Sequence, residues 1–312
     1  MEENANLRPV YVTKADMALS QLTSGGKLVA AQEQKFFLVA IKKAVMLPRV
    51  FTTTVDRDQK ELPKMTTFGS QVWYPATEME DLAYAQRSRP GYDKVEFTTH
   101  EIMCQVNFAR YFLRAQVERE GFQNTLIAYL GLHSARDFDN LVINGDTNSS
   151  NSLLALLDGM IAAASSNEYP ASGGSLSSEI LDGLMLTMPE EYADQDNLGF
   201  FTCRGARAAY RRELQNRPTP AGDKATTDAY DPTYDGIPVT RVPLFPTTLS
   251  GDETVVLHLN PKMFLYVIEE GVELETEYYK KARMWSIIMT ARVSQTYQHE
   301  PAVAYASAVL AS

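Results

Sequence analysis

Residues 138–146 read FDNLVINGD, and this stretch decides the fold because it ends a long helical pattern. Before it, apolar and small side chains recur every fourth residue, at Leu126, Leu130, Ser134, Phe138 and Val142. This spacing predicts one helix over residues 121–143, about 30 Å long at 1.5 Å per residue. Asn144 and Gly145 supply its stop, since glycine readily ends helices.

Two runs of strand composition, residues 50–55 and 65–74, lie on either side of a charged segment, residues 56–61. They predict a long β-hairpin. Its tip lacks Asn-Gly or Asp-Gly, which predicts a longer loop than a two-residue turn. A two-stranded ribbon is marginal in water by itself. We therefore expect this hairpin to lie on its own domain or on a neighbouring chain.

The remaining helical and strand patterns are segregated along the chain and do not alternate as βαβ units. Helices are expected over residues 28–47, 153–164, 181–186 and 204–214. Strands are expected over 94–115, with a register switch near His100, and over 199–203, 238–242, 254–259, 272–278 and 285–293. Residues 216–236 hold three prolines and two glycines and predict a long exposed loop. The fold class that fits is α+β.

Composition limits the classes of function. The 312 residues, 45% of them hydrophobic, suffice for a sizeable core in one or two domains. A formal charge of −10 argues against a protein whose main task is to grip nucleic acid. Cys104 and Cys203 lie far apart in the sequence, which argues against a disulfide scaffold or a structural zinc site. We see no signal peptide and no run of about 18 apolar residues, so we expect a cytoplasmic protein without a membrane partner.

The sequence contains no recognisable catalytic motif. It has no phosphate-binding glycine loop, no dinucleotide fingerprint and no nucleophile elbow, and its four histidines are scattered. Asp137, Asp139 and Asp146 flank the end of the long helix, but their spacing fails the calcium-loop template. We interpret them as helix surface and turn. The sequence therefore predicts no enzyme, no cofactor and no metal.

An acidic strand is the one cluster of titratable side chains. Glu273, Glu275 and Glu277 alternate, which places three carboxylates on one face of an expected edge strand. Such a face is solvated, or it pairs with basic groups of another chain. Acid–base catalysis is the least favoured of the three interpretations.

The order of these elements resembles the major capsid proteins of tailed double-stranded DNA phages, the Hong-Kong-ninety-seven-type shell fold shared with encapsulins. Residues 27–50 are similar to that family's N-terminal arm, and residues 138–146 match the end of its spine helix, which closes on Asn-Gly-Asp. Residues 235–246 are similar to its strand pair with the pattern G-x-P-V followed by prolines, and residues 272–303 to its C-terminal strands. The likeness covers essentially the whole chain in the right order.

The resemblance implies four parts. These are an N-terminal arm and helix (1–48), an extended loop over an adjacent subunit (49–75), a peripheral domain with the spine helix (76–150 and 281–312) and an axial domain (151–280). Contacts between subunits are expected at the tip of the extended loop, on the acidic strand and in the axial loop. The residues are Arg57, Asp58, Lys60, Glu61 and Lys64 at the tip, Glu273, Glu275 and Glu277 on the strand, and Arg217, Asp223 and Lys224 in the axial loop.

The function that follows is mechanical. Copies of the chain would form the pentamers and hexamers of an icosahedral shell around a portal, assembled in the host cytoplasm and enclosing double-stranded DNA. A separate scaffolding protein is expected, a decoration protein is possible, and no covalent cross-link is predicted. The alternatives are an encapsulin-type compartment with protein cargo and a soluble enzyme whose site does not show in the sequence.

Overall fold

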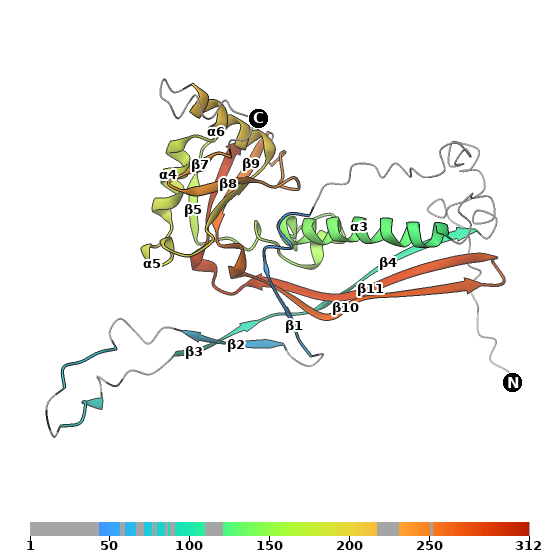
Figure 1. Ribbon diagram of the computed structural model, residues 1–312, viewed down its shortest axis with the longest axis horizontal. Coiled ribbons are helices and arrows are strands. Elements are labelled where there is room, and N and C mark those ends of the chain that lie inside the picture. Colours follow the sequence, from blue (N-terminus) through green and yellow to red (C-terminus); the bar gives the residue numbers. More distant parts are fainter. Residues whose placement is uncertain are drawn as a thin grey trace.

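The computed structural model describes residues 44–56, 60–66, 72–76, 78, 80–84, 87, 91–109, 121–216, 231–249 and 252–311. The expected N-terminal arm therefore lies outside the described residues up to residue 43. The chain is α+β, as the sequence predicts. Figure 1 shows a rounded part at one end, a long flat arm beside it, and a thin two-stranded ribbon that projects away from both.

The arm is built from one long helix along a four-stranded sheet. Helix α3 (Gly121–Asn144) confirms the predicted helix almost to the residue. The sheet order is β1-β10-β11-β4, with bounds Phe51–Thr54, Phe264–Tyr279, Met284–Tyr297 and His100–Ala109. Strand β1 runs parallel to β10, and the other pairs are antiparallel. Among the described helices, none combines the length and the apolar character needed to cross a bilayer.

The rounded part contains a six-stranded sheet with helices packed against it (Figure 1). Its strands, in spatial order, are β5 (Asn167–Pro170), β12 (Ala304–Leu310), β9 (Glu253–Leu259), β6 (Gly199–Thr202), β8 (Ile237–Arg241) and β7 (Thr233–Tyr234). Its helices are α4 (Ser178–Thr187), α5 (Glu190–Ala193) and α6 (Arg204–Gln215). Single 3-10 turns occur at η4 (Leu154–Leu156), η5 (Pro261–Met263) and η6 (Glu300–Ala302).

The strand pairing groups the C-terminal third differently from the expected domain boundaries. Strand β12 pairs with β9 and β5 in the six-stranded sheet, although residues 281–312 were expected beside the spine helix. Strand β10 pairs with β11 in the arm, although residues up to 280 were expected in the axial domain. The chain thus passes from the arm into the rounded part after β11.

The predicted hairpin is wrong in its pairing. Strand β1 pairs with β10, more than 200 residues away, and not with residues 65–74. The ribbon instead joins β2 (Glu61–Thr66) to β3 (Gly91–Glu96), so its turn lies within residues 67–90. The physical reason is burial: next to β1, Val55 packs with Leu265 and Val267 in a small apolar cluster. Because β1 and β2 lie in different sheets, the prediction of a hairpin tip at residues 56–61 is wrong.

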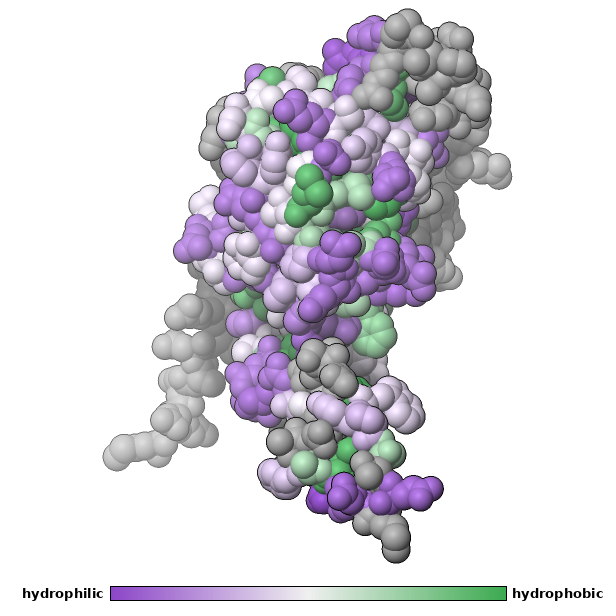
Figure 2. All heavy atoms as spheres, turned by 90° about the vertical axis from the view of Figure 1, so that its left-hand side faces the viewer, coloured by the Kyte–Doolittle hydropathy of each residue, from purple (hydrophilic) through white to green (hydrophobic). Residues whose placement is uncertain are grey.

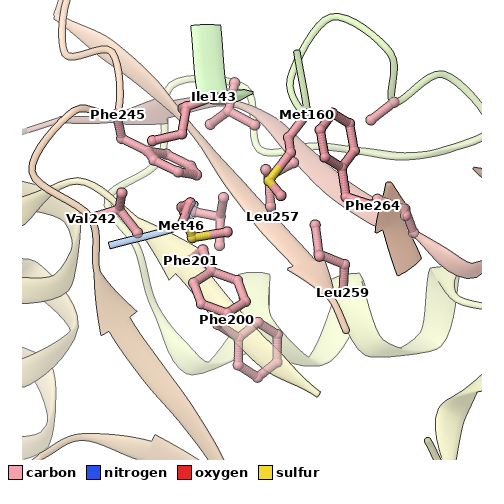
Figure 3. Packing of buried hydrophobic residues seen from close by; sticks show 14 of the residues in the cluster. Met46, Ile143, Met160, Phe200, Phe201, Val242, Phe245, Leu257, Leu259 and Phe264 are labelled. Carbon is pink, nitrogen blue, oxygen red and sulfur yellow. The ribbon is translucent and has the colours of Figure 1, made fainter. Parts of the chain in front are cut away.

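The main core lies where the arm meets the rounded part. Figure 3 shows Phe200 and Phe201 of β6 beside Leu257 and Leu259 of β9, with Ile143 at the end of α3 nearby. All five side chains are nearly or fully inaccessible to solvent. Met46, Met160, Val242, Phe245 and Phe264 are the other residues labelled in Figure 3. One continuous apolar cluster therefore joins the spine helix to both sheets.

A second buried feature lies in the sheet of the rounded part. His258 of β9 is 2% exposed and stacks on Phe200, with ring centroids 4.4 Å apart. Burial lowers the pKa of His258 to about 4, because the charged imidazolium loses its hydration there. The histidine is accordingly a neutral packing residue at physiological pH.

Two glycines let the chain cross itself at the end of α3. Gly145 follows the last residue of α3, as predicted, and it is not among the glycines with positive φ. A glycine is needed there because the neighbouring backbone leaves no space for a Cβ. A Cβ on Gly145 would lie 2.2 Å from the Leu157 carbonyl oxygen, and one on Gly159 would lie 2.7 Å from the Gly145 nitrogen. The Gly159 amide donates to the Gly145 carbonyl at 2.9 Å, and the Met160 amide donates to the Val142 carbonyl at 2.8 Å. These bonds hold residues 159–161 against α3, so the predicted helix at 153–164 is wrong except for the turn η4.

Gly159→Ala should therefore destabilise the subunit by about 2 kcal/mol or more, because backbone and not a flexible side chain meets the new Cβ. Gly131→Ala is the matched control, since Gly131 is an exposed α3 residue with nothing within 4 Å of its Cβ position. There alanine should stabilise by about 0.5–1 kcal/mol through helix propensity. Urea unfolding of both variants measures the difference, and equal unfolding midpoints would contradict the crossing.

Candidate assembly surfaces

The root of the β2/β3 ribbon is attached to the arm by a small apolar cluster and by charged side chains. Phe97 and Val95 at the end of β3 pack with Val55, Leu265 and Val267. Beyond β3, the Thr99 hydroxyl donates to the carboxylate of Glu269, whose other oxygen accepts from Arg292 Nη1 at 3.2 Å. The side chain of Glu269 is 3% exposed, and its ion pair with Arg292 joins β10 to β11 within the arm. The Thr99 hydrogen bond to Glu269 therefore ties the segment after β3 to the arm.

The residues expected at the loop tip lie at this root where the structure describes them. Arg57 and Asp58 fall outside the described residues, and Lys60 is exposed at the start of β2. Glu61 accepts from Lys94 of β3 at 2.6 Å, and Glu61 and Glu96 together hold the pKa of Lys94 above its ordinary value. Lys64 donates to the carbonyl of Gln298 at 2.7 Å. Glu61 and Lys64 therefore bind within their own chain.

The far part of the ribbon carries large apolar side chains on its surface. Trp73 is 89% exposed and Tyr84 is 70% exposed, and Val72 and Leu82 are also exposed. In Figure 2 the viewer faces the side from which the ribbon projects, and green hydrophobic residues interrupt the purple surface toward its lower end. Sequence analysis missed these residues, although a tryptophan inside a polar loop is a signal that could have found them.

A local ion pair shapes this far part. Arg87 donates through Nη2 to Asp81 at 2.7 Å and through Nε to the Leu82 carbonyl at 3.1 Å. Both charged side chains are well exposed, so the pair contributes little free energy and mainly restricts the path of the chain. The exposed apolar side chains thus lie in the segment between β2 and β3.

The acidic strand is the outer part of β10. Glu273, Glu275 and Glu277 are all exposed, and they lie opposite Thr290, Ile288 and Ser286 of β11, in that order. Strand β1 covers β10 only as far as Ile268, so within the described residues the other side of this stretch has no paired strand. The prediction that this is an edge is confirmed. Pairing with basic groups of another chain stays a prediction.

The axial-loop residues Arg217, Asp223 and Lys224 lie outside the described residues. The flanks of that loop are described. Arg207 of α6 binds Asp231 at 2.5 Å, and the Tyr210 hydroxyl donates to the Thr233 carbonyl at 3.1 Å. These contacts fix the segment after the loop to α6, the helix that precedes the loop.

One buried carboxylate holds the start of the described chain to the spine helix. Asp139 of α3 is fully buried. Its Oδ2 accepts from the amide of Val45 at 3.0 Å, and its Oδ1 accepts from the amides of Met46 and Leu47 at 3.0 and 2.7 Å. The interpretation of Asp139 as helix surface is therefore wrong. Its function is to anchor the segment that leads into β1.

Hydrogen bonds connect the end of the same helix to the turn after β8 and to β11. Asn144 Nδ2 donates to the Leu244 carbonyl at 2.7 Å, and Gln295 Nε2 donates to the Leu141 carbonyl at 2.8 Å. Two of the stretches on which the family resemblance rests, residues 138–146 and 235–246, thus meet in space. Within the described residues, no group of three or more histidine, cysteine, aspartate or glutamate side chains is arranged to hold a metal ion.

Removal of the Asp139 carboxylate should therefore lower the free energy of unfolding substantially. Asp139→Ala leaves three amide N–H groups without their acceptor at a buried site, and we expect a loss of about 3 kcal/mol or more. Asp137→Ala on the same helix, where the side chain is exposed, should change stability by less than about 0.5 kcal/mol. Thermal unfolding of the two variants tests this, and similar losses in both would rule out the anchor.

Comparison with known proteins agrees with this geometry. The chain is 27% identical over 300 residues to "Putative prophage capsid protein YqbE" of Bacillus subtilis (strain 168), covering 94% of this chain and 96% of that protein. The structure of Gordonia phage Cozz matches with a TM-score of 0.62 at 14% identity, covering 96% of each chain. The holo-SrpI encapsulin complex from Synechococcus elongatus PCC 7942 matches at 0.58 and 13% identity, covering 95% of this chain and 96% of that chain. No family model matches the sequence. The chain has the phage capsid fold, and the resemblance stated from the sequence is confirmed.

Proposed function

We propose that this chain is the major capsid subunit of a tailed phage, a structural protein whose copies assemble into an icosahedral shell. The observation that carries the proposal is the ribbon, which projects from the body and exposes Trp73 and Tyr84. Exposed aromatic side chains of this size are typical of surfaces that become buried in an interface. The ribbon is an extended loop that lies over the adjacent subunit of a pentamer or hexamer.

The difference in core size between the body and the ribbon supports this function. The body has a continuous core of its own, while the ribbon has only the small cluster at its root. Contacts made by the ribbon on a neighbour add buried area without requiring a larger core. The exposed carboxylates of Glu273, Glu275 and Glu277 steer association and set the register between copies more than they add affinity. The loop that contains Arg217, Asp223 and Lys224 lies at the fivefold and sixfold axes.

The proposal extends to partners and location. The subunit resides in the virion capsid after assembly in the host cytoplasm, around a portal and with a separate scaffolding protein. Double-stranded DNA is packaged by proximity, which fits a formal charge of −10 without a base-reading surface. A decoration protein would bind the outer face.

An encapsulin-type compartment is the second candidate, because the encapsulin structure covers nearly the whole chain at a TM-score of 0.58. The phage structure matches at 0.62, and the sequence relative has a capsid name, so the capsid is favoured. The contents of purified particles distinguish the two: DNA for a capsid, protein for an encapsulin.

Trp73→Ala should leave the subunit folded and prevent stable shells. The side chain is 89% exposed, so the free energy of unfolding should change by less than about 0.5 kcal/mol. Negative-stain microscopy and sedimentation then measure assembly. Leu186→Ala on α4 is the matched control, since Leu186 is 80% exposed but lies on the rounded part.

A second variant replaces residues 67–90 with a short glycine–serine turn and keeps β2, β3 and the ribbon root. Soluble subunits without shells are the expected result. Normal particles from both variants would contradict the role of the ribbon. A stable monomer of the unaltered chain with catalytic turnover would favour an enzyme instead.

A further inference from the structure

His299 joins three parts of the molecule. Lys64 of β2 donates from Nζ to His299 Nδ1 at 2.9 Å and to the carbonyl of Gln298 at 2.7 Å. On the other side of the ring, His299 Nε2 lies 2.7 Å from the hydroxyl of Tyr192 on α5, and the two rings meet edge-to-face at 5.0 Å. The ribbon, the segment after β11 and the rounded part therefore converge on one imidazole.

The partners define the protonation state of this ring. A lysine ammonium has donors and no acceptor, so Nδ1 must carry a lone pair and the proton must be on Nε2. The neutral ring then donates to the Tyr192 oxygen and accepts from Lys64. A second proton would place an N–H on Nδ1, facing the ammonium at 2.9 Å. Two donors and two positive charges would then oppose each other at that position.

We propose that His299 is a proton-operated latch, which holds the root of the extended ribbon on the body when neutral and releases it when protonated. The latch itself does not depend on the proposed function. Its consequence for a shell does: the angle of the extended loop, and with it the contact on the neighbour, would respond to pH.

Several charged groups face the ring, and together they set the pH range. Burial lowers the pKa of His299, and the positive charge of Lys64 lowers it further. The carboxylates that oppose this shift are Glu300 on η6, Asp93 on β3 and Glu191 on α5. Glu300 accepts the amide N–H groups of Ser165 and Ser166, so it is already oriented away from a new partner. The net pKa lies below the ordinary value.

The closed latch becomes less stable as the pH falls, because the closed and open forms bind protons differently. As pH falls below about 6.5, the released histidine takes up a proton more readily than the latched one, so closure of the latch becomes less favourable. Above that range both forms are neutral and the latch is closed. Apart from the bonds of Lys64, the described contacts of the root are Leu62, Val95 and Phe97 on the small cluster next to β1, and the Thr99–Glu269 hydrogen bond. Few described contacts therefore remain to hold the root in place when the Lys64–His299 bond is lost.

Hydrogen–deuterium exchange of the unassembled full-length subunit tests the latch. Exchange is followed in peptides from β2 and β3 at pH 7.5, 6.5 and 5.5, with labelling times scaled for the intrinsic rate. We expect protection of these peptides to fall about threefold or more from pH 7.5 to 5.5. In His299→Asn the side-chain carbonyl oxygen replaces Nδ1 as acceptor and does not titrate, so protection should be independent of pH. Lys64→Met should show low protection at every pH.

His133→Gln is the matched control, since His133 lies on α3 and pairs with Tyr129 away from the ribbon. It should keep the pH response of the unaltered protein. His258 does not interfere, because it stays neutral down to about pH 4. Protection that does not change with pH in the unaltered chain, or that falls equally in His299→Asn, would overturn the latch. Because unassembled subunits are measured, neither outcome depends on whether shells form.

Discussion

The Asp139 carboxylate is the constraint on which the rest of the structure depends. A buried charge is tolerated in a protein when hydrogen bonds replace its lost hydration, and here three amide groups do so. Those amides belong to residues 45–47, directly before β1. By fixing them to α3, Asp139 determines where β1 starts, and β1 then pairs with residues 265–268 of β10. The helix, the arm sheet and the entry of the chain are positioned together.

A second set of contacts, at Gly145 and Gly159, holds the end of α3 where the arm meets the rounded part. Residues 159–161 bond to the last turn of α3, while Asn144 and Gln295 bring the strands of both sheets to the same place. The arm is consequently rigid where it meets the rounded part and has fewer buried residues toward its far end. A rigid joint with exposed extremities suits a subunit whose stability resides in one region and whose contacts reside in another.

The elements that could be predicted from sequence are those whose signal is local. The stripe of α3 depends on neighbours within a few residues, and the helix that it predicts is confirmed. The change of pattern near His100 marks a break between β3 and β4, which lie in different sheets, so the single strand expected over residues 94–115 is wrong. The partner of β1 could not be found this way, because strand pairing depends on burial against residues 265–268. Asp139 was misread for the same reason, since its partners lie more than 90 residues away and a helix carboxylate is usually solvated. The candidate contact residues were misplaced for a similar reason. Their charges indicated the tip of a hairpin, whereas Glu61 and Lys64 form hydrogen bonds at the root of the ribbon.

The joint at the end of α3 and the root of the ribbon differ in how firmly they are held. In the proposed shell, this difference explains how copies of one sequence can occupy different positions. The joint at Asp139 and Gly145 is buried and fully bonded, so it resists deformation. The ribbon, by contrast, is held by a small apolar cluster, the Thr99–Glu269 hydrogen bond and the Lys64–His299 contact. A change in ribbon angle would disturb these few contacts and leave the core unchanged. Under the proposed function, pentamers and hexamers would require such differences between copies, and the ribbon is the part whose displacement would break few of the described contacts.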